Sequence, residues 1–146
     1  MKLETSKLLT RLSEQERNKV ETQLAELNDR KHTLEQQFLN SEAHIKQLNQ
    51  QRDQAMRKRH SASLLQVFDT AFREQQNRLT SIKAGIKAME VEKKDIFERL
   101  AKAQRTHYTY DSMHQKETKK QNRKDDLKAQ RQMDDMVASR RSSSSV

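Results

Sequence analysis

The sequence predicts an all-α protein, a long antiparallel two-helix coiled-coil hairpin with a C-terminal helical overhang. Its 146 residues include one glycine and no proline, and 35% of them are charged, 32% hydrophobic and 4% aromatic. This composition is typical of long helices and coiled coils, and not of a layered globule. Apolar residues recur at steps of three and four in each half of the chain, which indicates two helices with narrow apolar stripes. The short break near residue 60 favours antiparallel neighbours.

The first helix is expected over residues 3–58. Its apolar stripe places residues at the a and d positions of a heptad repeat, and such a narrow stripe requires a partner helix. The residues of this stripe are Val20, Leu24, Leu27, Leu34, Phe38, Ile45, Leu48 and Ala55.

The second helix is expected over residues 64–138, after a turn at 59–63 in which Ser63 and Gln66 form a capping box. Eleven of the fourteen a and d positions between Leu65 and Tyr110 are apolar or aromatic, so this stripe needs a partner as much as the first. Residues 142–146 are serine-rich and are expected to be disordered. The fourteen positions are Leu65, Phe68, Phe72, Gln75, Leu79, Ile82, Ile86, Met89, Lys93, Ile96, Leu100, Ala103, His107 and Tyr110.

The two stripes fit each other in one hairpin. In an antiparallel pair the numbers of facing residues add to a constant, and a turn near residue 60 predicts a value near 120, although 113 and 127 also pair a with d positions. Lys31 and Arg52 then lie within the apolar stripe, where they cost stability but help to fix the register. Near the open end both stripes are expected to slip by one residue, to Leu12 and Tyr108. Beyond that point the second helix projects past the first as an overhang.

The sequence contains no pattern typical of an enzyme or a metal site. There is no cysteine, no glycine-rich phosphate loop and no paired carboxylate in an apolar setting, so we expect no catalysis, no cofactor and no metal. His107, Asp111 and His114 share a helix face, but such scattered ligands are common on polar helices. No apolar run reaches the roughly 18 residues that a membrane helix needs. We therefore expect a cytoplasmic protein without a transmembrane segment.

The net charge of +9 is unevenly distributed. Residues 1–51 carry eight basic and eight acidic side chains, whereas residues 52–60 carry four against one and residues 116–141 carry nine against five. Nucleic acid is not an expected partner, because aromatic residues that could stack on bases do not interleave with the cations. The basic stretch from Arg57 to Arg59, with apolar Leu64 and Val67 nearby, is a candidate protein-binding surface at the turn.

The C-terminal run Arg131-Gln-Met-Asp-Asp-Met-Val-Ala-Ser-Arg-Arg141, on a chain of this length and architecture, resembles the FliJ family of bacterial flagellar export proteins. The related YscO-like proteins of injectisome type III secretion share the architecture. The resemblance implies a non-enzymatic stalk that inserts the open end of its hairpin into the export ATPase hexamer. It also implies contacts with the cytoplasmic domain of the export gate membrane protein and with export chaperones. The expected location is the cytoplasm, peripheral to the inner membrane.

By this resemblance, Met133, Asp134, Asp135 and Met136 are expected to contact the ATPase. A second set at the turn end is expected to contact the gate or a chaperone, although Phe68 and Phe72 also belong to the apolar stripe. Two alternatives stay open, a dimerising coiled-coil scaffold whose stripes pair between chains, and an injectisome stalk. The turn-end set is Arg57, Lys58, Arg59, Leu64, Val67, Phe68 and Phe72.

Overall fold

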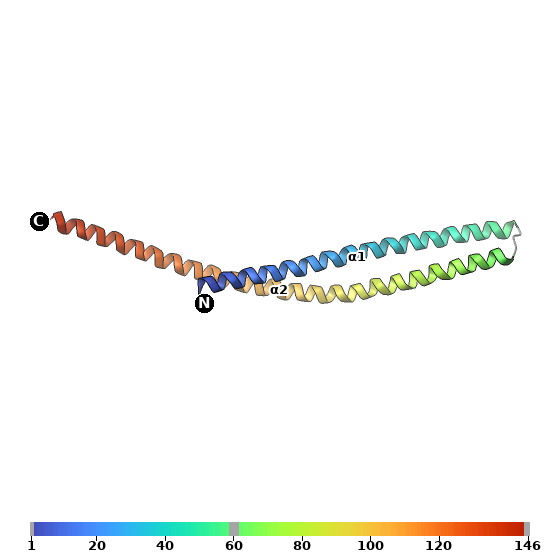
Figure 1. Ribbon diagram of the computed structural model, residues 1–146, viewed down its shortest axis with the longest axis horizontal. Coiled ribbons are helices and arrows are strands. Elements are labelled where there is room, and N and C mark those ends of the chain that lie inside the picture. The colour runs from blue at the N-terminus through green and yellow to red at the C-terminus, as the bar shows by residue number, and fades with distance from the viewer. Residues whose placement is uncertain (1, 59–61, 145–146) are drawn as a thin grey trace. The chain divides into compact units, whose positions relative to one another are not determined.

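Two helices account for almost all of the described chain. The computed structural model describes residues 2–58 and 62–144, which form α1 (Leu3–Arg57) and α2 (Ala62–Ser144), with no strand among them (Figure 1). The prediction of an all-α chain with two long helices is thus confirmed. Within these ranges, neither helix is long and apolar enough to cross a membrane.

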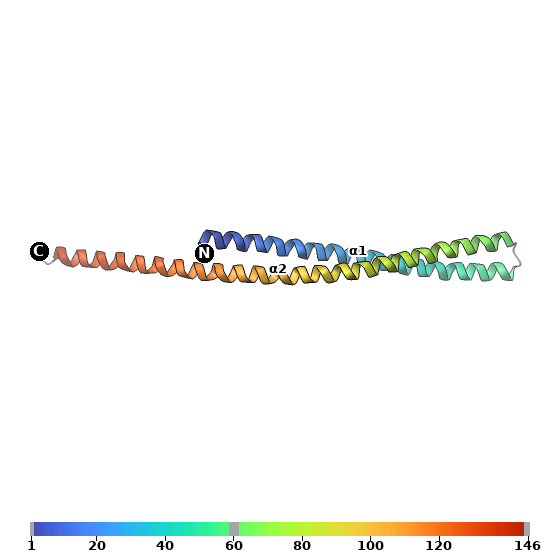
Figure 2. The ribbon, with the colours of Figure 1, turned by 90° about the horizontal axis from the view of Figure 1, so that it is seen from below.

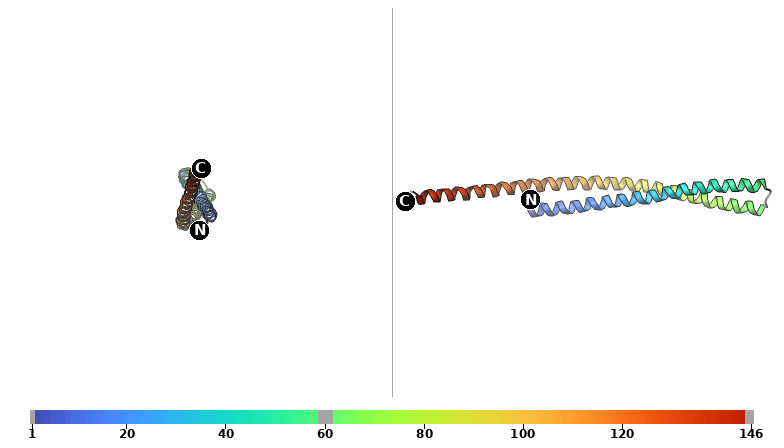
Figure 3. Two further views of the ribbon diagram at one scale, coloured as in Figure 1. Left: turned by 90° about the vertical axis from the view of Figure 1, so that its left-hand side faces the viewer. Right: turned by 90° about the horizontal axis from the view of Figure 1, so that it is seen from above.

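The chain divides into two units, each containing part of both helices. Unit 1 comprises Met1–Val20 with Leu100–Val146, and unit 2 comprises Glu21–Arg99. In unit 2, residues of increasing number in α1 contact residues of decreasing number in α2. The Arg99 guanidinium donates to Gln23 Oε1 at 3.1 Å, and the cation of Lys83 lies 5.6 Å from the centre of the Phe38 ring. The helices of this unit therefore run antiparallel and side by side (Figures 2 and 3).

The interior of unit 2 is a stripe of a and d positions from both helices, which we call the seam. Leu27 and Ile96 are 0% and 2% exposed, and Leu48 and Ala55 are also buried. Burial recurs every seven residues along α1, which is the spacing that a heptad repeat dictates. The hydrophobic effect of these side chains therefore holds the two helices of the unit together.

A cationic side chain in the seam of unit 2 packs against the face of an aromatic ring. The Arg52 guanidinium lies 4.9 Å from the centre of the Phe72 ring. Phe72 is one helical turn beyond Phe68, the residue whose number adds with 52 to the predicted value of 120. The Nε atom of Arg52 is buried without a hydrogen-bond partner. Stacking on an aromatic face attracts a guanidinium by about 0.5–2 kcal/mol, which partly offsets the unfavourable burial of its charge. The contact also explains how the seam accommodates a basic residue.

Gly85 allows close approach of the two helices in unit 2. A Cβ atom built on it would lie 3.2 Å from Cδ1 of Leu34, a contact that a small shift of a flexible leucine side chain relieves. Alanine is favoured over glycine in a helix interior by about 1 kcal/mol. We expect Gly85→Ala to raise the free energy of unfolding by up to about 1 kcal/mol in urea denaturation followed by circular dichroism. A loss of stability would show that Leu34 cannot move.

Unit 1 keeps the heptad phase of unit 2, and the predicted slip of the stripes is wrong. Ser13 is 7% exposed whereas Leu12 is 50% exposed, and Tyr108 is 74% exposed whereas His107 is half-buried. A slip of one residue would need local unwinding of both helices, and the unbroken α1 and α2 show none. The seam of this unit therefore passes through polar residues.

The ends of α2 differ from the expected ones. The helix begins at Ala62, so Ser63 lies inside its first turn and the predicted capping box does not form the helix start. At the other end the helix continues past the predicted residue 138 to Ser144, because no proline or glycine stops it. Ser143 Oγ donates to the carbonyl of Arg140 at 3.1 Å, within the segment that was expected to be disordered. Residues 145 and 146 lie outside the described residues.

Candidate partner-binding surfaces

Two serine–histidine pairs cross the seam of unit 1. Ser6 Oγ lies 3.0 Å from Nδ1 of His114, and Ser13 Oγ lies 3.1 Å from Nδ1 of His107. The numbers in each pair add to 120, the predicted register. Ser6 is fully buried, so this contact is part of the packed interior. A shift of seven residues in either direction could retain at most one of the two pairs, which makes them specific to this register.

Each serine hydroxyl of these pairs also contacts a backbone carbonyl of its own helix. Ser6 Oγ donates to the carbonyl of Leu3 at 2.8 Å, and Ser13 Oγ donates in the same way to the carbonyl of Thr10. Each serine Oγ therefore lies within hydrogen-bond distance of a backbone carbonyl oxygen and of an imidazole nitrogen. The two pairs are thus polar contacts within the packed interior of unit 1.

The histidines do not gather metal ligands. Nδ1 of His107 and of His114 is engaged by serine, and Asp111 accepts a hydrogen bond from Gln115 at 3.2 Å. Among residues 2–58 and 62–144 there is no group of three or more His, Cys, Asp or Glu side chains that could hold a metal ion.

At the turn end the predicted residues fall into two groups. Arg57, Lys58 and Val67 are exposed, Val67 by 64%. Phe72 packs against the Arg52 guanidinium, and Leu64 and Phe68 are half-buried. Arg59 lies outside the described residues. A shallow groove of about 470 Å³ runs along α2 here, lined by Ser63, Gln66, Val67, Thr70, Ala71 and Glu74.

Residues 119–144 of α2, which we call the overhang, are helical and uncovered. Every side chain from Lys119 to Ser143 is exposed, whereas seam side chains of α2 up to Glu117 are at least half-buried. The first part of α1 lies beside α2 within unit 1, and the overhang continues α2 with no neighbouring helix (Figures 1 and 2). Large apolar side chains are exposed on it, Met133 by 69%, Met136 by 58% and Val137 by 47%. The overhang thus presents several exposed apolar side chains to a partner.

The four overhang residues expected to contact the ATPase do not share one face. At about 100° per residue, Met133 and Met136 lie within about 60° of each other, and Val137 joins them. Asp134 and Asp135 lie on other sides, each about 100° or more from Met133. Apolar residues at positions i, i+3 and i+4 are typical of a helix that docks into a hydrophobic groove. The apolar face, as we call it below, consists of Ala129, Met133, Met136 and Val137.

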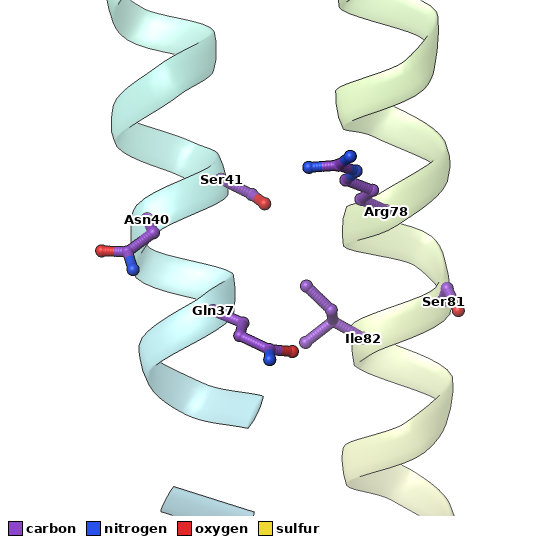
Figure 4. Close-up of a pocket in the computed structure, with 6 residues that line it drawn as sticks. All are labelled: Gln37, Asn40, Ser41, Arg78, Ser81 and Ile82. Atoms are coloured by element: carbon purple, nitrogen blue, oxygen red, sulfur yellow. The ribbon is translucent and has the colours of Figure 1, made fainter. Parts of the chain in front are cut away.

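A polar notch interrupts the seam in the middle of unit 2. Ser41 occupies a buried d position, and its small side chain leaves a groove of about 430 Å³ between the helices. Figure 4 shows Ser41 and Arg78 directed across the space between the helices, together with Ile82. Asn40 and Ser81 point away from it. The helices are therefore less closely packed at the notch, where the heptad pattern of the sequence has a serine in place of an apolar residue.

Comparisons with family models, with curated proteins and with solved structures found no match.

Proposed function

We propose that this chain is a non-enzymatic stalk and escort component of a bacterial flagellar type III protein export apparatus. In this proposal the overhang engages the export ATPase hexamer, and the turn end meets the export gate or a chaperone at the cytoplasmic side of the inner membrane. The observation that carries it is the overhang, a helix with an exposed apolar face where the sequence resembles the FliJ family. An apolar stripe on an otherwise polar helix supports docking into a groove of another protein.

The structure favours the stalk over a dimerising scaffold. A scaffold of that kind would pair its stripes between two chains, whereas within this one chain the seam positions of α1 and α2 meet each other, as Ser6 and His114 do. The seam is therefore occupied, and partner contacts fall to surfaces outside it. An injectisome stalk would use the same surfaces, so the choice between the two export systems rests on the sequence resemblance.

Removal of the overhang tests the proposal. A chain ending at Thr118 retains Ser6, Ser13 and both of their histidine partners, so its hairpin is expected to fold. We expect the full chain to co-purify with the export ATPase and to stimulate ATP hydrolysis, and the shortened chain to do neither, because the apolar face is absent. The measurements are pull-down and steady-state ATPase rate.

A second variant changes only the apolar face. Met133→Ser with Val137→Ser removes exposed apolar surface without shortening the helix, so it should weaken association in the same direction as the truncation. Leu39→Ser changes an equally exposed leucine of unit 2 and should leave association unchanged. Full stimulation by the shortened chain would reject the overhang as the docking element.

A further inference from the structure

The heptad phase of α2 continues into the overhang, but the chemistry of its positions changes. In unit 1 the a and d positions of α2 up to Glu117 pack toward α1. The next positions in phase are Gln121, Lys124, Lys128 and Arg131, followed by Asp135, all exposed. An apolar and hydrogen-bonded stripe is therefore followed on the same side of the helix by a run of three cations.

Four cations are concentrated on this side of the overhang. Lys120 flanks the seam positions, and at about 100° per residue Lys120, Lys124, Lys128 and Arg131 lie within about 80° of one another. Among the described residues, none of these four cations lies within 4.0 Å of a carboxylate oxygen. We call these four residues the basic face.

The surface is hollow where the basic face begins. Lys120 and Lys124 line a groove of about 340 Å³ in unit 1, next to the start of α1. Lys2 adds a third ammonium group to the same groove, which also has one carboxylate, that of Glu117. Cations that line one concave surface reinforce one another's potential and attract a negatively charged partner. The groove lies in line with the seam, where the next layer of a facing helix would pack.

The basic and apolar faces of the overhang are on opposite sides of the helix. Their mean directions differ by roughly 170° at 100° per residue. Because the two faces point in opposite directions, a flat anionic membrane surface cannot contact both of them at once. No aromatic side chain lies in the overhang to stack on unpaired bases. A folded acidic protein surface fits the geometry better than a lipid or a nucleic acid.

We propose that the basic face binds an acidic α-helix of a protein partner, which continues the seam beyond the start of α1. Carboxylates at the a and d positions of that helix meet Lys124, Lys128 and Arg131, and the first turn of the helix fills the groove beside Lys120. The overhang is then held on two opposite sides by its partner. The inference rests on the proposed function only for the assignment of that helix to the export ATPase.

Charge reversal on matched faces tests this proposal. Lys124→Glu, Lys128→Glu and Arg131→Glu reverse the basic face, and Lys116→Glu, Lys119→Glu and Arg123→Glu make the same change of charge about 110° round the helix. All six positions are exposed, so both variants are expected to fold. The probe is a synthetic alanine-based helix of about three heptads with glutamate at its a and d positions.

We expect the full chain to bind this peptide, and reversal of the basic face to weaken binding at least about tenfold, because attraction becomes like-charge repulsion. The control reversal should weaken it less than about threefold, since its charges are directed elsewhere and are screened. Equal losses in the two variants would overturn the proposal, as would no binding of the peptide. Tighter binding of a short DNA duplex or of phosphatidylserine vesicles than of the peptide would also overturn it.

A second arm separates this inference from the proposed function. The same variants are assayed for association with the export ATPase beside the chain that ends at Thr118. If the shortened chain associates normally, the proposed function fails, while the peptide arm still decides the inference. If shortening abolishes association but reversal of the basic face matches its control, the acidic helix does not belong to the ATPase and that assignment is overturned.

Discussion

Leu27→Ala is expected to lower the free energy of unfolding by about 2–5 kcal/mol, the range measured for leucine truncation in packed interiors. Leu27 is 0% exposed at a seam position of unit 2, and it occupies the same heptad position as buried Leu48 and Ala55. Truncation removes apolar contacts and leaves a cavity between two helices that have few other contacts to compensate. Urea denaturation followed by circular dichroism measures the change.

Leu39→Ala is the matched control for this prediction. Leu39 lies on the same helix and is 62% exposed, so the identical chemical change should alter stability by less than about 0.5 kcal/mol. The comparison removes the effect of helix propensity, since both sites replace leucine by alanine inside α1. Equal losses at the two positions would mean that the seam is not where the apolar contacts are made.

The sequence predicts the seam of unit 2 because burial there follows apolar character. Leu27, Leu48 and Ile96 are apolar, fall in heptad phase and are buried. The register near 120 also follows from the position of the turn, since helix rise is constant and the turn is short. Contacts such as that between Arg30 and Glu92, whose side chains approach to 3.5 Å, agree with this register.

The prediction for the open end is wrong because apolar character and heptad phase disagree there. Leu12 and Tyr108 are the more hydrophobic neighbours of Ser13 and His107, and they suggested a slip that the structure does not contain. A hydrogen-bonded pair can occupy a seam without leaving a polar group unsatisfied. The heptad phase therefore continues through the polar residues, and the apolar neighbours stay exposed. The signal was present in the sequence, since Ser6, Ser13, His107 and His114 all fall in the phase of the apolar seam.

The candidate binding residues could be placed only in part. Sequence spacing alone separates Met133 and Met136 from Asp134 and Asp135 once the segment is known to be helical. The exposure of Val67 and the contact of Phe72 with Arg52 depend on side-chain packing, which the heptad assignment does not specify. Adjacent turn-end residues therefore divide between interior and surface in a way that composition could not reveal.

Because of the polar pairs, the contacts between the helices are expected to be less stable in unit 1 than in unit 2. Ser6 and Ser13 bury little apolar area, and a typical intramolecular hydrogen bond contributes only about 0.5–1.5 kcal/mol net. A fully buried leucine contributes about 1.5–3 kcal/mol relative to an exposed one. The first turns of α1 are thus expected to separate from α2 at a lower free energy than the helices of unit 2, and amides of residues 3–20 should exchange with solvent faster than those of residues 24–55.

Leucine at all four positions of the two serine–histidine pairs should reverse this difference. Four leucines at these buried and half-buried positions, in place of two hydrogen bonds, are expected to raise the free energy of opening in unit 1 by at least about 3 kcal/mol, because the apolar gain exceeds the loss. That change corresponds to roughly a hundredfold slower amide exchange in residues 3–20, measured by mass spectrometry. Four leucines at exposed sites of the same helices provide the control and should leave exchange within about threefold of the parent. Equal protection in the parent and the seam variant would mean that the serine–histidine pairs hold α1 as firmly as an apolar seam does. The control sites are Lys7, Gln15, Gln104 and Thr106.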